Sequence, residues 1–510
     1  MLVKTIGCAL FGIDAISVTI EVNIDKGIQF FLVGLPDSAV KESHQRIEAA
    51  LNNLGFKYPR KKITINMAPA DIRKEGSAYD LPIAIGILAA SEQVSLDRLE
   101  QYILMGELSL DGSLNPIKGA LPIAIKAKQE NFKGVIVPTA NAKEAAVVSD
   151  IEVIGAENLT EVVDFLNGST EIKPVTITPE DAERDEFFDL DFCDVKGQEN
   201  IKRALEIAAA GSHNVILIGP PGSGKTMLAK RMPSILPPLT MAESLETTKI
   251  HSVAGLMGHH TSLLMTRPFR SPHHTVSDAG LVGGGTYPQP GEISLAHNGV
   301  LFLDELPEFK RTVLEVMRQP MEDRIVTISR AKMTVDFPAN FMLIAAMNPC
   351  PCGYYNHPER ACTCKPGAVQ QYLNRISGPL MDRIDLHVEV TPVPYNDLSE
   401  RRNGERSSMV RERVIAARKI QEARYADFPS IHANAQMSPQ LIEKYCDLDE
   451  TCRTMLKNAM CRMGLSARAH DRILKVARTI ADLDGSDNIQ SCHLAEAINY
   501  RSLDRSNWGN

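Results

Sequence analysis

The sequence predicts an α/β protein in which two α/β domains are followed by an all-helical one. Three observations lead to this prediction. Strand-like and helix-like segments alternate over residues 1–168, a glycine-rich loop separates an apolar run from a helical segment within 215–231, and helical periodicity alone follows residue 397. We therefore expect domains at 1–168, 192–396 and 397–510, with an acidic linker at 169–191.

Composition restricts the class of protein. The chain has 510 residues, 44% of them hydrophobic, and a formal net charge of −8. A negative chain has no overall basic field for nucleic acid, so any DNA-binding surface has to be local. The longest clean apolar run, residues 81–90, is too short to cross a bilayer, and the first residues lack a signal-peptide layout. We expect a cytoplasmic protein without a membrane partner.

The first domain is predicted from two kinds of periodicity. Period-two alternation and short apolar runs predict strands, whereas an apolar stripe at helical spacing predicts a helix. The expected strands are 16–22, 29–34, 62–67 and 135–138, and the expected helices are 38–54, 80–90 and 122–129. This part of the chain has no nucleotide-binding loop of its own.

The second domain begins with a phosphate-binding pattern. The apolar run Val215–Ile218 precedes a loop, and a helical segment follows it; the loop consists of Gly219, Pro220, Pro221, Gly222, Ser223, Gly224, Lys225 and Thr226. Backbone N–H groups can wrap a triphosphate where side chains do not block their approach. Lys225 is expected to reach the β- and γ-phosphates and Thr226 to bind Mg²⁺, so the sequence predicts ATP with Mg²⁺ as ligands.

Two further strands end in polar residues. Val300–Leu303 is apolar enough for a central parallel strand and is followed by Asp304 and Glu305. Asp304 is expected to hold Mg²⁺, and Glu305 to polarise the attacking water as a general base. The alternative is a helix N-cap. The strand 341–347 ends at Asn348 in the same way.

Together these segments resemble the AAA+ ATPases. The resemblance implies that Asn348 senses the γ-phosphate and that Arg383 is an arginine finger for a neighbouring subunit, with Arg375 as the alternative. A surface ion pair of Arg383 with an adjacent aspartate is the other interpretation. It also implies that the helical domain is a lid whose Arg468, or else Arg472, contacts the γ-phosphate.

The first domain resembles the proteolytic domain of Lon-type proteases, which has a ribosomal S5-type fold. The resemblance lies in two stretches, residues 73–80 and 106–119. That family uses a serine and a lysine, because its chemistry needs a hydroxyl and an amine base. The glycines align Ala78 and Leu121 with these positions, which predicts an inactive protease fold; a shifted pair, Ser77 and Lys118, is the alternative.

A segment between the nucleotide motifs narrows the resemblance. It reads Arg267-Pro268-Phe269-Arg270-Ser271-Pro272-His273-His274 and continues through glycine-rich residues 280–285 to 290–299. With the Lon-like domain, it resembles the YifB/ComM family of magnesium chelatase-like ATPases over essentially the whole chain. The resemblance implies a homo-hexameric motor that remodels single-stranded or branched DNA, with helicase or branch-migration activity in recombination and natural transformation. Recombination proteins are then possible partners. A chelatase-like motor acting on a protein partner is the alternative.

Two basic clusters are candidates for DNA contact. Arg267 and Arg270 stand in the family-specific segment, where they could instead brace their own loop. Residues 322–335 read as a hairpin with Arg330 and Lys332 at its tip, for which a solvated turn is the alternative.

Four cysteines stand close together after Asn348. They are Cys350, Cys352, Cys362 and Cys364. Four thiolates can close a tetrahedral Zn²⁺ site, which would fix this loop beside the γ-phosphate sensor. His357 is a spare ligand, and reduced thiols or a redox switch are the alternatives.

Overall fold

The computed structural model describes residues 1–177, 188–258, 261–285, 287–330, 333–357, 359–392, 404–428 and 431–501. The chain divides into two units. The first comprises Met1–Asp185 and Thr240–Met265, and the second comprises Glu186–Leu239 and Thr266–Asn510.

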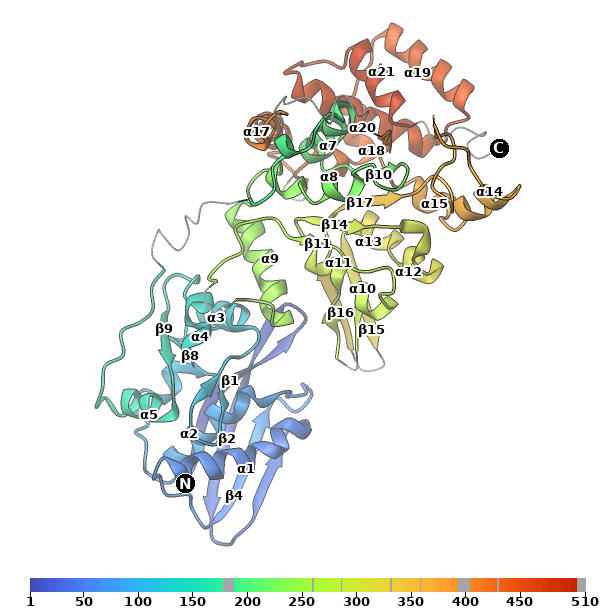
Figure 1. Cartoon of the computed structure of the whole chain (residues 1–510). Helices are drawn as coiled ribbons and strands as arrows, with labels where there is room; N and C mark the ends of the chain where they lie inside the picture. Colours follow the sequence, from blue (N-terminus) through green and yellow to red (C-terminus); the bar gives the residue numbers. More distant parts are fainter. Residues whose placement is uncertain are drawn as a thin grey trace. The chain divides into compact units, whose positions relative to one another are not determined.

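The first unit is built on a seven-stranded mixed sheet with the order β3-β4-β2-β1-β5-β8-β9 (Figure 1). Its strands are β1 (Leu2–Phe11), β2 (Asp14–Asp25), β3 (Phe30–Val33), β4 (Lys62–Ala68), β5 (Tyr102–Leu104), β8 (Gly134–Pro138) and β9 (Glu152–Ala156); β6 (Glu107–Leu108) and β7 (Leu114–Asn115) form a separate small pair. The pairs β1–β2 and β2–β4 are antiparallel, and the remaining pairs of the large sheet are parallel. Along β2 and β4 buried and less buried residues alternate, which is the periodicity that predicted these strands.

Helices cover this sheet. They are α1 (Ser38–Asn53), α2 (Asp80–Ala90), α3 (Ala120–Gln129), α4 (Thr139–Ala145) and α5 (Leu159–Asn167). Every residue of α2 is buried, which explains why its sequence is apolar on all sides. The Asp37 side chain caps α1 by accepting the Val40 N–H, and Asn158 caps α5 through the Glu161 N–H.

One helix reaches the first unit from the later sequence. The helix α9 (Met241–Ala254) begins with a capping box of Thr240 and Glu243 and ends at a left-handed glycine. It packs on α3, where the Gly119 N–H donates to the Ser252 carbonyl at 3.1 Å and the Ser252 hydroxyl donates to the buried Glu144 carboxylate. Residues 240–265, which the sequence prediction included in 192–396, therefore belong to the first unit.

The second unit contains a five-stranded parallel sheet with the order β11-β14-β17-β10-β18. The strands are β11 (Phe269–Arg270), β14 (Val300–Leu303), β17 (Met342–Met347), β10 (Val215–Ile218) and β18 (Leu386–Glu389). All residues of β10, β14 and β17 are buried, as expected of central strands covered on both faces. The predicted parallel core is confirmed.

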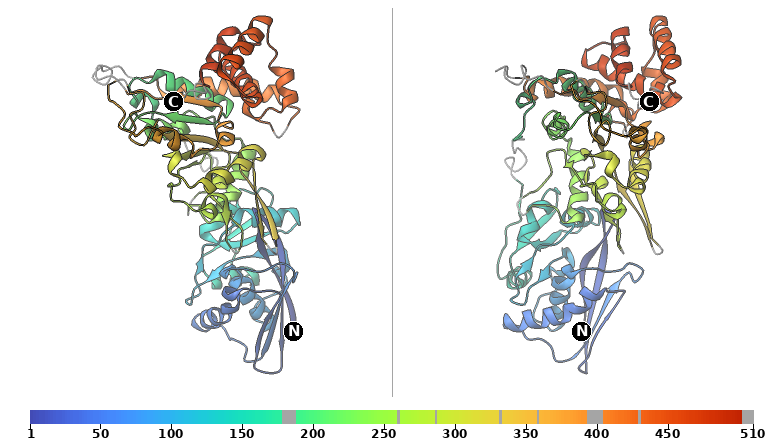
Figure 2. Two further views of the ribbon diagram at one scale, coloured as in Figure 1. Left: turned by 90° about the vertical axis from the view of Figure 1, so that its right-hand side faces the viewer. Right: turned by 45° about the vertical axis from the view of Figure 1, so that its right-hand side comes forward.

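Short helices and two hairpins surround this sheet. The helices are α7 (Glu199–Gly211), α8 (Lys225–Ala229), α10 (Asp278–Val282), α11 (Glu292–Leu295), α12 (Arg311–Val316), α13 (Arg318–Asp323), α14 (Ala368–Leu373) and α15 (Gly378–Met381). One hairpin pairs β12 (Gly283–Gly284) with β13 (Gln289–Pro290), and the other pairs β15 (Ile325–Arg330) with β16 (Met333–Pro338). The β15–β16 hairpin, predicted from the sequence, projects away from the sheet (Figures 1 and 2).

The C-terminal part of the second unit is helical, as predicted. It contains α17 (Ser407–Arg424), α18 (Pro439–Tyr445), α19 (Glu450–Met463), α20 (Ala467–Leu483) and α21 (Ser491–Asn499). The buried stripe of α20 shares one hydrophobic core with α7 and the parallel sheet. The fully buried Asp385 accepts the Asn214 N–H at 2.9 Å and pairs with Arg472 of α20, which joins the helical region to the sheet.

Candidate nucleotide-binding site

The predicted phosphate-binding loop connects the central strand β10 to α8. Gly222 and Gly224 have positive φ angles of 77° and 89°, and a side chain at Gly219 would meet the Val390 carbonyl oxygen at 2.3 Å. The Lys225 ammonium group donates to the carbonyls of Gly219 and Pro220 at 2.7 and 2.9 Å. Burial lowers the pKa of Lys225 below its ordinary value. The loop is therefore folded around its own lysine, with its backbone free of bulky side chains.

Three parallel strands bring the other predicted residues to this loop. The Thr226 hydroxyl donates to Asp304 Oδ2 at 2.6 Å, and Lys225 Nζ donates to Asn348 Oδ1 at 3.2 Å. Asp304 follows β14 and Asn348 follows β17, and β17 lies between β14 and β10 in the sheet. The carboxyl ends of parallel strands meet at one edge of the sheet, which is where such proteins bind ligands. Thr226 and Asp304 supply the hydroxyl and carboxylate oxygens that Mg²⁺ prefers.

Glu305 lies beside this group but faces another residue. Its backbone is left-handed, with φ 54°, and its side chain is 57% exposed. The Glu305 carboxylate contacts His274, with 3.4 Å between Oε2 and Nδ1. Glu305 therefore follows Asp304 directly, with its carboxylate in contact with a residue of the family-specific segment.

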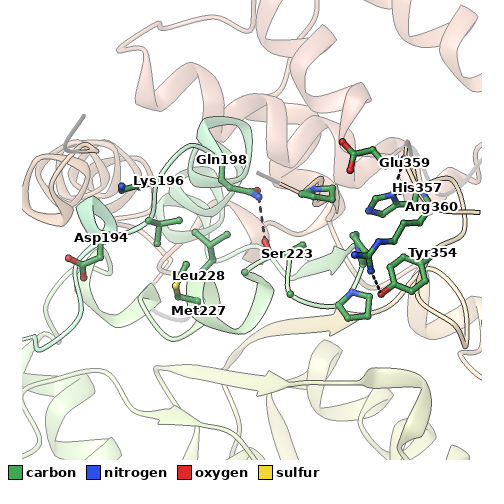
Figure 3. Close-up of a pocket in the computed structure, with 16 residues that line it drawn as sticks. Asp194, Lys196, Gln198, Ser223, Met227, Leu228, Tyr354, His357, Glu359 and Arg360 are labelled. Atoms are coloured by element: carbon green, nitrogen blue, oxygen red, sulfur yellow. Dashed lines mark hydrogen bonds between the residues drawn. The ribbon is translucent and has the colours of Figure 1, made fainter. Parts of the chain in front are cut away.

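A cavity of about 440 Å³ opens beside the phosphate-binding loop (Figure 3). One wall is the segment Asp194–Gln198, whose Gln198 amide donates to the Ser223 carbonyl at 3.4 Å and to the Thr391 carbonyl at 2.7 Å. The lining also includes Met227, Leu228 and Pro392. The volume lies in the range usual for small-molecule sites, about 300–1,000 Å³.

The opposite wall comes from the loop that carries the cysteines. The sequence predicts this loop beside the γ-phosphate sensor, but not that its side chains line the cavity. Tyr354, His357 and Arg360 line the cavity there (Figure 3). Arg360 donates to the Tyr354 hydroxyl at 3.0 Å and lies 5.2 Å above its ring. The loop approaches the phosphate-binding loop so closely that a side chain at Gly353 would meet Pro221 Cδ at 2.5 Å. The position of this segment directly after Asn348 was the available signal.

The structure gathers the four predicted cysteines. The Sγ atoms of Cys350, Cys352, Cys362 and Cys364 all lie within 4.8 Å of one another, and three of the separations are 3.3, 3.5 and 3.8 Å. A tetrahedral Zn²⁺ site with Zn–S bonds of about 2.3 Å requires separations of about 3.8 Å. Burial raises the pKa of Cys350, and it raises the pKa of Cys364 to about 12. Although burial opposes it, hydrogen bonds from the backbone N–H groups of Tyr354 and Thr363 lower the pKa of Cys352 to about 5. The donor set therefore fits zinc.

The two candidate arginine fingers differ in accessibility. Arg383 has a side chain that is only 7% exposed, donates to the Pro379 carbonyl at 2.6 Å and pairs with Glu322 at 2.6 Å. Arg375, the alternative, is 53% exposed and pairs with Glu308 at 3.0 Å. A finger has to extend into another subunit, which requires an accessible side chain. By this criterion Arg375 is the better candidate of the two arginines.

The two candidate sensor arginines also differ in their surroundings. Arg472 pairs with the buried Asp385 and so has a structural partner inside its own chain. Arg468, one turn earlier on α20, is exposed and does not line the described cavity.

The candidate DNA contacts fall into two groups. Arg267 donates to the carbonyls of Pro237 and Asn298, and Arg270 forms a bidentate pair with Glu292, with both distances 2.7 Å. The structure thus supports the bracing alternative for these two side chains, because their donors are used within the chain. Arg330 is exposed at the end of β15, where it donates to the Gly285 carbonyl at 3.2 Å. Lys332 lies outside the described residues.

The two positions that align with the Lon-type serine and lysine carry neither a hydroxyl nor an amine. Ala78 lies in a short 3₁₀ turn, and Leu121 is fully buried in the first turn of α3. The neighbouring Ser77 hydroxyl donates to the Glu107 carboxylate, and Lys118 is exposed. The predicted inactive protease site remains a prediction, with Ser77 bonded to an acid.

Comparison with known proteins gives a consistent result over the whole chain. Family models match residues 20–141 (subunit ChlI of Mg-chelatase), 191–398 (magnesium chelatase, subunit ChlI) and 404–501 (its C-terminal part). Competence protein ComM of Haemophilus influenzae is 47% identical over 502 residues, which are 98% of this chain and 97% of its own. The chain belongs to the ComM/YifB family of magnesium chelatase-like proteins.

Further relatives of this ComM/YifB chain agree. Uncharacterized protein YifB of Escherichia coli (strain K12) is 46% identical over 502 residues, 98% of this chain and 96% of its own. Lon protease 2 of Bacillus subtilis is 33% identical over 143 residues, 28% of this chain and 25% of its own, which adds to the Lon-type resemblance. The family is one of AAA+ motors, which implies ATPase activity with ATP and Mg²⁺ as ligands. In the part of the chain that the structure describes, no helix combines the length and hydropathy needed to cross a membrane.

Proposed function

We propose that this protein is a homo-hexameric motor that uses ATP hydrolysis to remodel single-stranded or branched DNA, with branch migration or helicase activity during recombination. The observation that carries the proposal is the linked group of Lys225, Thr226, Asp304 and Asn348 at one sheet edge, in a relative of competence protein ComM. A protein that acts on recombining DNA would work in the cytoplasm beside recombination proteins.

Each residue of the site has a distinct task in hydrolysis. Lys225 would exchange its carbonyl partners for the β- and γ-phosphate oxygens, and Thr226 and Asp304 would hold Mg²⁺ between them. Mg²⁺ supplies neutralisation of the charge on the transferring phosphoryl group. Glu305 would accept a proton from the attacking water, and Asn348 would orient the γ-phosphate and that water.

A ring would complete the site with cations from a neighbouring copy. Arg375 is the more accessible of the two candidate fingers, whereas Arg383 would first have to break its ion pair with Glu322. Arg468 is exposed on α20, so its guanidinium group is accessible for a contact with the γ-phosphate from the lid. Mixing Arg375→Ala or Arg383→Ala protein with Lys225→Ala protein tests this: the true finger variant regains ATPase activity in mixed rings.

The β15–β16 hairpin is the proposed DNA contact. It projects from the sheet of its unit (Figures 1 and 2), and the exposed Arg330 is the last residue of β15. Because the chain has a net charge of −8, a local cation on a protruding hairpin is the kind of contact that the composition permits. Arg330→Ala should weaken DNA binding without changing the affinity for ATP.

We also propose that the four cysteines hold one structural Zn²⁺ per chain. Cys350, Cys352, Cys362 and Cys364 would bind it as thiolates, and the ion would fix the loop that carries Tyr354 and Arg360 against the cavity. The metal content of protein purified without chelators, measured by mass spectrometry, should be close to one zinc per chain and should fall in Cys352→Ser. Protein without zinc would refute this part.

The experiment that tests the motor is the ATPase rate without DNA and with single-stranded, duplex or four-way-junction DNA, each at two salt concentrations. Stimulation by junction or single-stranded DNA, weakening at higher salt, is the expected result. A rate indifferent to every DNA would refute the DNA motor and favour a protein partner of the chelatase kind.

A further inference from the structure

We infer that Arg360, on the cysteine loop (residues 350–364), binds the γ-phosphate of ATP from within its own chain and thereby makes the site prefer ATP to ADP. The inference rests on the proposed function in one respect, the assignment of the cavity beside the phosphate-binding loop as the ATP site.

The cysteine loop lies at the triphosphate end of this cavity. It begins two residues after Asn348, which accepts a hydrogen bond from Lys225 Nζ at 3.2 Å. It also packs on the first half of the phosphate-binding loop, where a side chain at Gly353 would meet Pro221 Cδ at 2.5 Å. The lysine of such a loop contacts the β- and γ-phosphates. A side chain that enters the cavity from the cysteine loop therefore approaches the nucleotide at its phosphates.

The opposite wall suits the base. Val195 and Leu228, both buried, line it together with Pro392. Nucleotide sites combine apolar surface with a few polar groups that fix the orientation of the ligand. An adenine ring gains most from the apolar wall, and a triphosphate gains most from backbone N–H groups and cations. The cavity therefore orients the nucleotide with its phosphates toward Arg360.

Arg360 is held at the cavity by aromatic neighbours. Its Nη1 donates to the Tyr354 hydroxyl at 3.0 Å, and its Cζ lies 5.2 Å from the centre of that ring (Figure 3). Its backbone N–H donates to His357 Nδ1 at 3.1 Å, and the His357 ring meets the Tyr354 ring edge-on at 5.6 Å. Within the described ranges, no carboxylate pairs with Arg360. The guanidinium group is therefore oriented while its charge stays uncompensated.

The other arginines considered for the γ-phosphate have different surroundings. Three of them form ion pairs with carboxylates of this chain: Arg375 with Glu308, Arg383 with Glu322 and Arg472 with Asp385. Neither these three nor Arg468 lines the described cavity, whereas Arg360 does. An ion-paired arginine has to give up a carboxylate before it binds a phosphate. Arg360 gives up only a neutral phenol, and the charged hydrogen bond that replaces it is the stronger one.

The expected consequence is selectivity for the triphosphate. ADP keeps the phosphates that the backbone of the phosphate-binding loop surrounds, but it lacks the terminal group that Arg360 binds. A guanidinium group presents two parallel N–H donors to a phosphate, which a lysine ammonium group cannot do. Loss of Arg360 should therefore reduce the affinity for ATP and spare the affinity for ADP.

The test measures dissociation constants of full-length variants for Mg²⁺ complexes of ADP and of an ATP analogue with a non-hydrolysable β,γ-imido bridge, by displacement of a fluorescent nucleotide. Arg360→Ala should weaken binding of the analogue by about tenfold, as expected for one charged hydrogen-bonded contact, and should leave ADP affinity within about twofold of the wild type. Arg360→Lys should recover part of the loss, because it keeps the charge without the paired donors. Lys365→Ala is the matched control: it removes a cation from an exposed position of the same loop that does not line the cavity, so both affinities should stay at the wild-type values.

A second experiment tests whether Arg360 acts within its own chain. In mixtures of Arg360→Ala with Lys225→Ala protein, ATPase activity at subsaturating ATP should not recover, because no site then contains both residues. Recovery would place Arg360 in a neighbour's site and overturn the inference.

Two results of the affinity measurement also overturn it. Unchanged affinity of Arg360→Ala for the analogue would mean that Arg360 does not bind the γ-phosphate, and equal weakening for the analogue and ADP would mean that the change disturbs the loop or the base. A wild type that binds neither nucleotide would refute the ATP site together with this inference. ATPase activity indifferent to DNA would refute the DNA motor alone, since the comparison of the two nucleotides still decides the role of Arg360.

Discussion

Two arginines one turn apart on α20 should have different effects on stability when each is replaced by alanine. Arg472 pairs with Asp385, whose side chain is 1% exposed, whereas Arg468 is exposed. Arg472→Ala leaves a buried carboxylate without its strongest partner, and removing one partner of a buried pair costs about 3–5 kcal/mol. Asp385 keeps the Asn214 N–H at 2.9 Å and His213 at 3.5 Å, so we expect the lower end, about 3 kcal/mol. Arg468→Ala should change stability by less than about 0.5 kcal/mol.

Hydrogen exchange followed by mass spectrometry measures this difference locally, which suits a chain of two units. In Arg472→Ala, amides of α20 and α7 should exchange more than about 100-fold faster, as a loss of about 3 kcal/mol implies. Peptides of α2, in the other unit, are the internal control. Arg468→Ala should leave exchange unchanged while lowering ATPase activity in rings. Equal protection of α20 in Arg472→Ala and the wild type would show that Asp385 does not depend on this pair.

Three further predictions concern the same unit. Although burial opposes ionisation, Arg472 and His213 hold the pKa of Asp385 well below its ordinary value. The stability that Asp385 contributes over Asp385→Asn should therefore be complete at neutral pH and decrease progressively as pH falls below about 4, as measured by α20 exchange. Lys225→Ala should lose ATP binding in a fluorescent-nucleotide titration, whereas Glu305→Gln should bind ATP normally and hydrolyse it at least about 100-fold more slowly. Gly353→Ala, at φ 84° and facing Pro221, should lower ATP affinity by about tenfold; unchanged affinity would mean that the loop does not wall the site.

The nucleotide site was predictable because its parts are local motifs joined by a sheet. A glycine-rich loop after an apolar run, and polar residues at the ends of two other apolar runs, already imply a common edge if the strands are parallel. The structure confirms that arrangement with Thr226 bonded to Asp304 and Lys225 to Asn348. Helix α2 was equally clear, because its residues are apolar on every side and all of them are buried.

The roles of single cations were harder to predict, because a cation's role depends on partners that sequence does not place. Arg267 donates to the Pro237 carbonyl, and Arg270 pairs with Glu292; both partners are distant in sequence. The assignment of residues 240–265 to the first unit was missed for a similar reason. The composition of helix α9 does not differ from that of the neighbouring sequence. Its position is set by hydrogen bonds of Ser252 with Gly119 and Glu144.

The cysteine loop shows how one short segment can serve two parts of the site. Asn348 contacts Lys225, and Tyr354 and Arg360, which follow within twelve residues, line the cavity. Asn348 and the cavity wall therefore share one stretch of backbone. Among the described residues between Cys350 and Cys364, Cys350 itself is the one buried side chain, and no apolar core holds the loop in shape. Ordering such a loop costs conformational entropy that packing does not offset here. A cross-link among the four thiolates would offset it, and losing that link should therefore weaken ATP binding and γ-phosphate sensing together.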